Sequence, residues 1–409
     1  MTPVAPWLPE RLPDGWHIAQ MRRIATFRNG ADYKDVEVST GGYPVYGSGG
    51  EFRRAAQYLY DGDSVLFGRK GTIDKPLLVS GRFWTVDTMF FTELKAGIEP
   101  RFLHYYATTM PFDYYSTNTA LPSMTQGQLG GHRLALPPVP EQRAIADFLD
   151  RETVRIDMLI EEQQRLIALS RERRTAVRTE RALKGTRPMN LAASPLPWAK
   201  RLPSEWQVVP LTSVARLESG HTPSRTRDDW WEDCYIPWIS LNDVGAMRET
   251  KYLETTTHQL SDEGIANSSA RLLPANTVVL SRDATVGRTA IMRIAMATSQ
   301  HFAAWICGPR LDPEYLWTLF TDAMQPYFAS FQNGSTIRTI GMGDLKAFRI
   351  PLPPLDEQRR IVAHLDEQTA QIDDLIAESE RFVELARERR SALIAAAVTG
   401  QIDVRSEVA

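Results

Sequence analysis

The feature that most constrains this chain is a long segment that occurs twice, 216 residues apart. Leu136 to Val177 and Leu352 to Leu393 share 22 identical residues over 42 positions aligned without a gap. Each copy follows a longer segment that matches its counterpart weakly, although Arg11 to Trp16 returns as Arg201 to Trp206. A repeat period of 216 residues corresponds to a whole domain plus a helix, which is much longer than a solenoid unit. The pattern indicates a molecule that does one job at two places.

Each repeated segment predicts a long helix. Glu141 to Lys184 contains no Pro or Gly, and its apolar residues recur at spacings of 3, 4 and 7. Pro140 stands at its start and Gly185 follows its end, which is the usual asymmetry of helix termini. The second copy runs from Glu357 to Thr399. At 1.5 Å per residue, the first helix would be a rod of roughly 66 Å.

The charges of the two helices predict how they pair. Residues 141–162 carry seven acidic and three basic side chains, and residues 163–184 carry two and seven. The second helix has six acids and two Arg over 357–378, then three Glu and four Arg over 379–399. Antiparallel pairing sets each acidic half against the other's basic half. The alternative is that these charges are solvated faces that follow each helix's own macrodipole.

The segments before the helices are predicted to be β-rich. Short runs of β-branched and aromatic residues alternate there with Gly-rich turns. The runs are residues 64–67, 77–79 and 84–92 in the first segment and 278–280, 289–294 and 302–307 in the second; residues 100–110 and 313–331 are expected to be helical. The fold class is therefore α+β, with two β-rich domains, each followed by a long helix, and the two helices paired as an antiparallel coiled coil with pseudo-two-fold symmetry. The expected boundaries are a first domain over 1–140, a helix over 141–185, a linker over 186–200, a second domain over 201–355, a helix over 356–400 and a tail over 401–409.

Composition and motifs exclude several classes of protein. No apolar run is long enough for a membrane span, the N-terminus lacks a signal-peptide core, and two cysteines give no disulfide framework, so we expect a cytoplasmic protein that has no membrane partner. The seven His form no metal cluster, and no Walker A or Asn/Asp/Ser-Pro-Pro-aromatic motif is present. We therefore predict no catalytic residue and no metal ligand. A net charge of −3 gives no general basic footprint, so a nucleic-acid surface would have to be local.

Polar loops recur at matching places in the two domains and supply candidate DNA-binding residues. Arg can bind guanine O6 and N7 bidentately, and Ser, Thr and Asn contact phosphates and bases. The alternative for each loop is an ordinary exposed hairpin whose Gly, Pro and Thr serve backbone geometry. The candidates in the first domain are Tyr46, Ser48, Arg69, Lys70, Thr72, Asn118, Ser123 and Thr125. Those in the second are Ser240, Asn242, Asp243, Arg282, Asp283, Thr285, Ser335, Thr336 and Arg338.

Together these features resemble the specificity subunit of type I restriction-modification systems. The resemblance is carried by Pro137 to Arg143 and Pro351 to Arg359 at the helix starts, by the two Arg-Leu-Pro-x-x-Trp motifs, and by the ending Val398 to Val404. It spans essentially the whole chain. Leu replaces the family's Ile in both Arg-Leu-Pro motifs, and the first helix ends Leu-Lys-Gly where the second ends Val-Thr-Gly.

The resemblance implies that each β-rich domain is a target recognition domain for one half of a split, asymmetric double-stranded DNA site. It also implies that the helices fix the gap between the half-sites and dock modification subunits, expected to be two, with restriction and translocase subunits as further partners. S-adenosylmethionine, ATP and magnesium would then bind to those partners, and no cofactor would bind to this chain. Two alternatives stay open: a coiled-coil adaptor with two protein-binding domains, and a methylation-only specificity subunit without a restriction partner. A self-sufficient restriction or methylation enzyme is disfavoured by the missing motifs.

Overall fold

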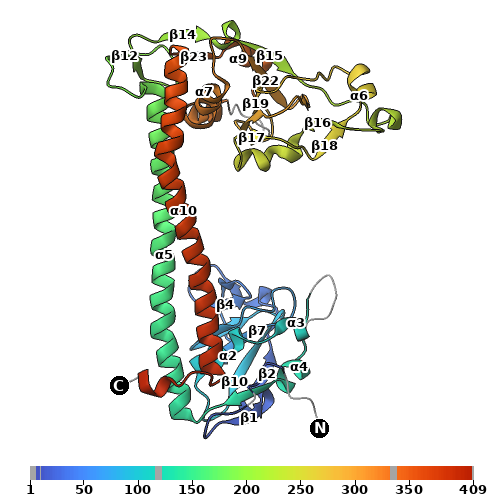
Figure 1. Ribbon diagram of the computed structural model, residues 1–409. Coiled ribbons are helices and arrows are strands. Elements are labelled where there is room, and N and C mark those ends of the chain that lie inside the picture. The colour runs from blue at the N-terminus through green and yellow to red at the C-terminus, as the bar shows by residue number, and fades with distance from the viewer. Residues whose placement is uncertain (1–5, 10, 116–121, 332–338, 408–409) are drawn as a thin grey trace. The chain divides into compact units, whose positions relative to one another are not determined.

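The structure is a computed structural model that describes residues 6–9, 11–115, 122–331 and 339–407. Its contacts divide the chain into two compact units, Met1–Arg165 with Ser379–Ala409, and Leu166–Glu378. The division crosses both long helices, so each unit holds one globular part and a piece of each helix (Figure 1). Each unit is therefore built from both halves of the sequence.

The described residues of the first unit form three sheets and several short helices. A four-stranded sheet has the order β2-β10-β7-β8, a five-stranded sheet has the order β3-β5-β4-β9-β6, and β1 pairs with β11. The strands are β1 (His17–Gln20), β2 (Ala25–Asn29), β3 (Glu37–Val38), β4 (Tyr43–Gly47), β5 (Gly50–Ala55), β6 (Tyr60–Asp61), β7 (Ser64–Gly68), β8 (Leu77–Val79), β9 (Arg82–Thr85), β10 (Met89–Leu94) and β11 (Arg133–Leu136). The short helices are α1 (Met21–Ile24), η1 (Lys34–Val36), α2 (Pro100–Thr108), α3 (Phe112–Tyr115), α4 (Gln126–Gly131) and η7 (Val404–Glu407).

The second unit repeats this plan with longer connections. Its central sheet has the order β15-β22-β19-β20-β17, a three-stranded sheet has the order β18-β16-β21, and β14 pairs with β23. The strands are β12 (Leu191–Ala193), β13 (Arg201–Pro203), β14 (Gln207–Pro210), β15 (Ala215–Ser219), β16 (Ile236–Ile239), β17 (Tyr252–Leu253), β18 (His258–Leu260), β19 (Val278–Ser281), β20 (Thr289–Met292), β21 (Ala297–Thr298), β22 (Phe302–Cys307) and β23 (Arg349–Leu352). The helical segments are η2 (Leu211–Ser213), η3 (Asp228–Trp231), η4 (Leu241–Val244), η5 (Ala246–Arg248), α6 (Asp262–Ala266), α7 (Pro313–Thr318), η6 (Leu319–Ala323), α8 (Gln325–Ser330) and α9 (Met342–Ala347).

The α+β class is confirmed, with three local differences from the expected elements. The run expected as one strand over 84–92 is two strands, β9 and β10, because the chain turns at residues 86–88. The helix expected over 313–331 is divided into α7, a π-helical turn and α8, which begins with Pro326 in its first turn, where a proline is tolerated. Residues 186–200 include β12, which pairs with β13, so this segment is partly ordered against the second domain.

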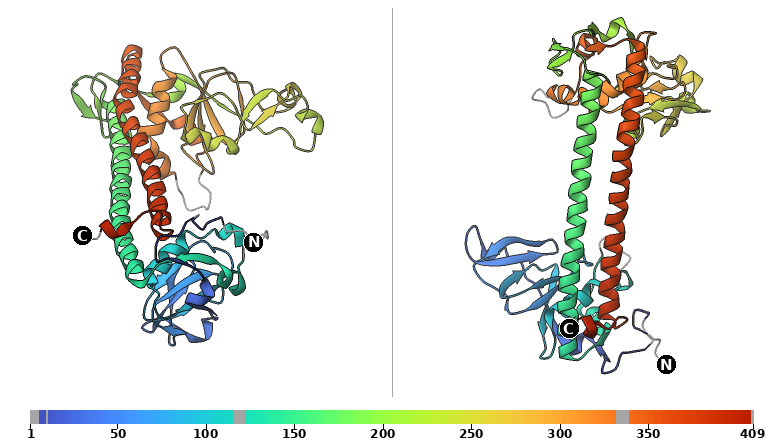
Figure 2. Two further views of the ribbon diagram at one scale, coloured as in Figure 1. Left: turned by 60° about the horizontal axis from the view of Figure 1, so that its bottom comes forward. Right: turned by 60° about the vertical axis from the view of Figure 1, so that its left-hand side comes forward.

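The two long helices are α5 (Val139–Lys184) and α10 (Leu355–Val398), and they are antiparallel within each unit. In the first unit Arg390 Nε lies 2.9 Å from Asp157 Oδ1, and in the second Arg174 Nε lies 2.9 Å from Asp373 Oδ1. Asp157 and Asp373 occupy equivalent positions of the repeat, as do Arg174 and Arg390. Each helix therefore supplies the acid in one ion pair and the base in the other. Both views in Figure 2 show the end of α10 beside the start of α5. The antiparallel pairing predicted from charge is confirmed.

A buried glutamine joins the start of α5 to the first domain. Gln142 is 1% exposed, and its Oε1 accepts a hydrogen bond from the Glu99 N–H at 2.9 Å. Its Nε2 donates to the carbonyls of Pro137 at 2.9 Å and Gly97 at 3.3 Å. The amide therefore ties the strand that leads into α5 to the loop that leads into α2.

Gln358 makes the same contacts at the start of α10. It is fully buried, and its Oε1 accepts from the Asp312 N–H at 2.8 Å. Its Nε2 donates to the carbonyls of Pro353 at 2.8 Å and Arg310 at 2.9 Å. We call Gln142 and Gln358 the glutamine anchors. Their identical bonding accounts for the glutamine that occurs at both helix starts.

The end of each long helix packs on an Arg-Leu-Pro-x-x-Trp motif. Gly185 and Gly400 follow the two helices with φ of 78° and 75°, a conformation that favours glycine. A Cβ on Gly185 would lie 3.2 Å from the Trp206 ring, and one on Gly400 would lie 2.5 Å from Pro13 and 3.3 Å from the Trp16 ring. The C-terminal helix is therefore seated on the first domain, at the other end of the sequence.

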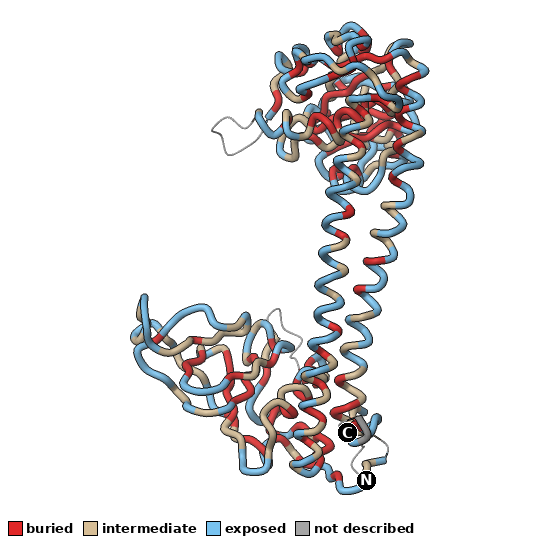
Figure 3. The backbone as a smooth tube through the Cα atoms, turned by 90° about the vertical axis from the view of Figure 1, so that its left-hand side faces the viewer, coloured by how far each residue is buried: buried red, intermediate tan, exposed pale blue. Residues whose placement is uncertain are grey.

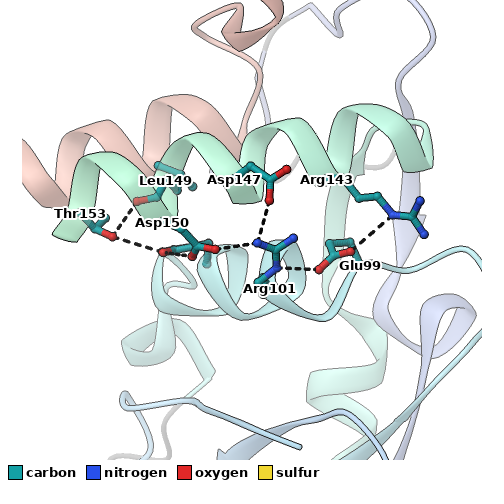
Figure 4. A network of polar contacts seen from close by, with 8 residues as sticks. Glu99, Arg101, Arg143, Asp147, Leu149, Asp150 and Thr153 are labelled. Carbon is teal, nitrogen blue, oxygen red and sulfur yellow. Dashed lines mark hydrogen bonds and ion pairs between the residues drawn. The ribbon is translucent and has the colours of Figure 1, made fainter. Parts of the chain in front are cut away.

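Charged side chains add a polar contact between each domain and the helix that follows it. In the first unit Arg101 of α2 lies 2.7 Å from carboxylate oxygens of both Asp147 and Asp150 on α5 (Figure 4). The Tyr105 hydroxyl donates to Asp150 at 2.7 Å. Burial raises the pKa of Tyr105 to about 12, so its phenol remains a donor. In the second unit the corresponding contact is made by Lys251, which forms ion pairs with Glu314 and with Asp366 on α10.

Buried residues gather in the globular parts, whereas most of the surface of α5 and α10 is exposed (Figure 3). Among the described residues, one buried ion pair occurs in the second unit and has no counterpart in the first. Arg178 of α5 is 6% exposed, its Nε lies 2.8 Å from Asp322 Oδ2, and its guanidinium packs on Trp317. The corresponding positions in the first unit hold Ile394, which is 3% exposed, and Thr109. The two units therefore dock the ends of their long helices with different chemistry.

Replacing Gln358 by Ala is expected to lower the free energy of unfolding of the second unit by roughly 2–4 kcal/mol. The change leaves the Asp312 N–H and two carbonyls buried without partners. The matched control is Gln368→Ala, an exposed site on the same helix, where we expect a change within about 0.5 kcal/mol. Urea denaturation followed by tryptophan fluorescence measures both variants, and equal losses would contradict the role of the anchor.

Replacing Arg178 by Ala is expected to cost roughly 3–5 kcal/mol at pH 7, because it leaves a buried carboxylate unpaired. Burial already raises the pKa of Asp322, and Arg178 opposes this rise. Stability from a carboxyl with a raised folded pKa is present at low pH and is lost as pH rises through that pKa. The cost of Arg178→Ala should therefore shrink as the pH is lowered, as measured by denaturation between pH 4 and pH 8.

Two double variants control this experiment. Arg178→Ala with Asp322→Asn should lose the added pH dependence, since no buried carboxyl remains. Arg178→Ile with Asp322→Thr copies the first unit and should be more stable than either single variant, because a buried ion pair can be replaced by apolar packing at little cost. A double variant as unstable as Arg178→Ala would show that the site needs the ion pair.

Candidate nucleic-acid interface

The first recognition loop, residues 69–73, follows β7 and is fixed by backbone hydrogen bonds to the turn between β9 and β10. The Arg69 N–H donates to the Thr88 carbonyl at 2.8 Å. The Arg69 guanidinium donates to the Asp87 carbonyl at 3.3 Å and lies 5.9 Å from the Phe90 ring centre. Arg69 is half-buried and is held through its backbone N–H and one guanidinium nitrogen, which leaves its other guanidinium N–H groups for an external acceptor.

A third segment, residues 122–125, completes the surface in the first domain. Lys70 pairs with Ser123 in an isolated bridge, and the Gly71 N–H donates to the Pro122 carbonyl at 3.0 Å. Lys70 is exposed, as is Thr72 beside it. Thr125 is exposed too, but its Oγ1 accepts from the Gln128 N–H at 3.2 Å and caps α4. The structure therefore brings together candidates that lie about 50 residues apart in sequence.

The second recognition loop, residues 282–287, repeats this construction. The Arg282 N–H donates to the His301 carbonyl at 2.9 Å, and the Ile340 N–H donates to the Arg282 carbonyl at 2.7 Å. The Nε of Arg282 is buried and has no acceptor among the residues that the structure describes. Thr285 is half-buried, and its N–H donates to the carbonyl of Asp283 at 2.6 Å.

The two loops differ in the charge at their second position. Asp283 forms an isolated bridge with Thr339, as Lys70 does with Ser123. The Asp283 carboxylate also lies 2.7 and 2.8 Å from Nδ1 of His301, a residue that the sequence did not single out. One backbone frame therefore presents a lysine in the first domain and an aspartate–histidine pair in the second.

Two sequence candidates in the second domain are buried. The Ser240 N–H and Oγ donate to Asp243 Oδ2 at 2.8 and 3.1 Å, which caps η4. The other Asp243 oxygen accepts from the N–H and hydroxyl of Thr257, both at 2.7 Å. Ser240 is 7% exposed and Asp243 is 4% exposed. Both side chains are occupied in local structure, so we place neither of them on the interface.

The remaining described candidates are Tyr46 on β4, Ser48 in the β4–β5 hairpin and Asn242 in η4. The Tyr46 carbonyl accepts from the Val86 N–H at 3.1 Å, which attaches β4 to the turn before β10, and burial raises the pKa of the Tyr46 phenol. Ser48 is half-buried at the tip of the β4–β5 hairpin. Asn242 is exposed, and its Nδ2 lies 2.9 Å from Nε2 of His258.

Four candidates lie outside the described residues. They are Asn118 in the first domain and Ser335, Thr336 and Arg338 in the second. The residue that precedes the first of these segments is held by a histidine: the Tyr115 hydroxyl lies 2.6 Å from Nδ1 of His132, and the Tyr106 hydroxyl lies 2.8 Å from Nε2. Burial lowers the pKa of His132 to about 4, so this imidazole is neutral at physiological pH.

Sequence reasoning missed Gln300 and His301, which lie directly before β22. No repeat motif marks them, because the first domain has Asp87 and Thr88 at the corresponding distance from its loop. They join the second recognition loop only through the fold. Within residues 6–9, 11–115, 122–331 and 339–407, no group of three or more His, Cys, Asp or Glu could hold a metal ion, and no helix is long and apolar enough to cross a membrane.

A family model for the type I restriction modification DNA specificity domain matches the chain twice, over residues 13–167 and 203–383. The two matches together cover well over half of the chain. They begin near the two Arg-Leu-Pro-x-x-Trp motifs and end within the two long helices.

Named relatives are specificity subunits. The chain is 29% identical over 186 residues to the type I restriction enzyme MjaIX specificity subunit of Methanocaldococcus jannaschii. This alignment covers 45% of the chain and 42% of the relative. It is 25% identical over 193 residues to the EcoR124I/EcoR124II specificity subunit of Escherichia coli, covering 45% and 46%. The matched part therefore spans less than half of each of these relatives.

Solved structures share the fold over nearly the full length. A chain from work on complex assembly and conformational transition of the type I R-M system superposes with a TM-score of 0.76, at 19% identity, covering 96% of this chain and all of that one. The HsdS subunit from Thermoanaerobacter tengcongensis gives a TM-score of 0.55 at 19% identity, covering 96% and 99%. At this identity the likeness concerns the fold.

Proposed function

Because the chain belongs to the family of type I restriction-modification DNA specificity proteins, we propose that it is the sequence-reading subunit of such a complex. Each globular domain recognises one half of a bipartite, asymmetric site in double-stranded DNA. The observation that carries this proposal is the backbone frame that occurs twice and holds Arg69 and Lys70 in one domain but Arg282 and Asp283 in the other. Two equal frames with different side chains suit two different half-sites.

The paired helices set the gap between the half-sites and dock the modification subunits, of which we expect two. The proposal is supported by the rigid attachment of α5 and α10 to their domains through the glutamine anchors. A fixed distance between two readers requires helices that cannot swivel at their starts. Unequal readers on such a spacer favour a non-palindromic site, since a perfect protein dyad would favour a palindrome.

The chain contributes recognition and no bond-making chemistry in this proposal. S-adenosylmethionine binds to the modification subunits, which methylate adenine, and ATP and magnesium bind to restriction subunits where these exist. A system that only methylates would use this chain in the same way. The complex acts on DNA in the cytoplasm.

The function is tested with the full chain reconstituted with the modification subunits of its own system. Single-molecule sequencing of DNA methylated by this complex should show modified adenines within one bipartite motif, and the motif should vanish without this chain. Binding to that DNA should weaken steeply with salt, because contacts to phosphates release counterions. An adaptor of protein partners would bind all DNA equally poorly, and a self-sufficient enzyme would methylate DNA without the other subunits.

Replacing Arg69 by Ala should relax specificity at one position of the first half-site. The loss of a base-contacting Arg costs roughly 1–3 kcal/mol at the position that it reads. Arg282→Ala is the reciprocal control, because it should relax one position of the second half-site and leave the first unchanged. Competition binding with duplexes that vary at single positions measures both. Equal weakening on every sequence would assign both side chains to phosphate contacts instead.

A further inference from the structure

Four polar side chains form a continuous row beside the second recognition loop. The Thr222 hydroxyl donates to Gln300 Oε1 at 2.7 Å. Gln300 Nε2 lies 3.4 Å from Nε2 of His301, and His301 Nδ1 lies 2.7 Å from the Asp283 carboxylate. Gln300 is exposed and the His301 side chain is 33% exposed, so the middle of the row is open to an external ligand.

The neighbours fix the direction of each hydrogen bond in the row. An ionised Asp283 can only accept, so it selects the tautomer of His301 that carries its proton on Nδ1 and leaves a lone pair on Nε2. Thr222 donates to Gln300 Oε1, which turns the amide NH₂ group toward that lone pair. The long separation of 3.4 Å makes the Gln300–His301 contact weak and easy to exchange. The exposed middle of the row therefore offers one donor beside one acceptor.

The row is attached to the recognition frame by backbone hydrogen bonds. The His301 carbonyl accepts from Arg282, and Asp283 pairs with Thr339. At the corresponding places the first domain has Thr88 instead of His301 and Lys70 instead of Asp283. The donor–acceptor pair thus belongs to the second domain alone, at the place where the two readers are expected to differ.

We propose that Gln300 and His301 recognise an adenine in the second half-site through its major-groove edge. This inference rests on the proposed function. Adenine presents N7 as an acceptor and the N6 amino group as a donor. Gln300 Nε2 donates to N7, and the N6 amino group donates to the lone pair on His301 Nε2. Asp283 acts as a positioning residue, because it holds the histidine tautomer that accepts.

The other three bases fit this pair less well. Guanine presents two acceptors, N7 and O6, so its O6 would face the histidine lone pair. Thymine presents the O4 acceptor and a methyl group, and cytosine presents an amino donor whose neighbouring acceptor, O6, belongs to the paired guanine. Only adenine presents the donor and the acceptor on a single base, which is what the purine and 7-deaza analogues test. A good bidentate pair discriminates by roughly ten-fold or more against the wrong base.

The test changes atoms on both sides of the contact, in the reconstituted complex. We expect one adenine of the second half-site at which 7-deazaadenine, which lacks the N7 acceptor, weakens competition binding by about five-fold or more. Purine, which lacks the amino group, should weaken it similarly. The 7-deaza effect should disappear in Gln300→Ala, and the purine effect should disappear in His301→Ala. Gln207→Ala, at an exposed site on β14, is the matched control and should keep both effects.

Specificity for the first half-site is the internal control for folding, and it should be unchanged in all three variants. If a variant loses specificity for the first half-site, the test rests on the effects of 7-deazaadenine and purine measured with the unsubstituted protein. Dependence on both N7 and N6 at one position supports the contact. A second half-site without such an adenine, or analogue effects that persist in Gln300→Ala and His301→Ala, would overturn it. The bipartite methylation motif would stand in either case, so this failure is distinct from failure of the proposed function.

Discussion

A buried glutamine amide at the start of each long helix is the contact on which the rest of this structure depends. Gln142 and Gln358 each satisfy one backbone N–H and two carbonyls that lie on both sides of the junction between domain and helix. An amide that bonds both sides leaves the helix one way to depart from its domain, because any rotation would strand buried polar groups. Salt contacts such as that of Arg101 add to this junction but are half-exposed and can vary, as Lys251 demonstrates.

Because the two long helices are antiparallel, each unit contains segments from both halves of the chain. The core of the first unit includes Ile394 and Val398 from the C-terminal helix, and Gly400 closes on Pro13 and Trp16. The second unit closes on its own Arg-Leu-Pro-x-x-Trp motif at Gly185. The same junction therefore forms once between neighbours in sequence and once between the two ends of the chain. The two Arg-Leu-Pro-x-x-Trp motifs at the domain starts are therefore the surfaces on which the ends of the long helices pack.

The helices and their direction could be predicted because period and charge are local properties of the sequence. The ion pairs of Asp157 and Asp373 follow directly from the acid-first, base-last pattern. The arrangement of the candidate interface was predictable only in part. Arg69 and Arg282 stand at matching places in both halves, but nothing local distinguishes an exposed Asn242 from a buried Asp243. Gln300 and His301 escaped prediction because they meet the loop through strand pairing of distant segments, and no repeat marks that place.

The net charge of −3 counted against DNA binding at the level of composition, and the structure explains why that measure is weak here. Many charged side chains form ion pairs within the protein. Arg174 and Arg390 pair with acids of the opposite long helix, and Arg178 is buried against Asp322. Discrimination between bases depends on the order of donors and acceptors on a small rigid surface. An aspartate that fixes a histidine tautomer can sharpen that order even though its charge opposes phosphate. If the chain acts as proposed, within a larger complex, its surface serves hydrogen-bond discrimination between bases, and a general basic footprint on this chain is not required.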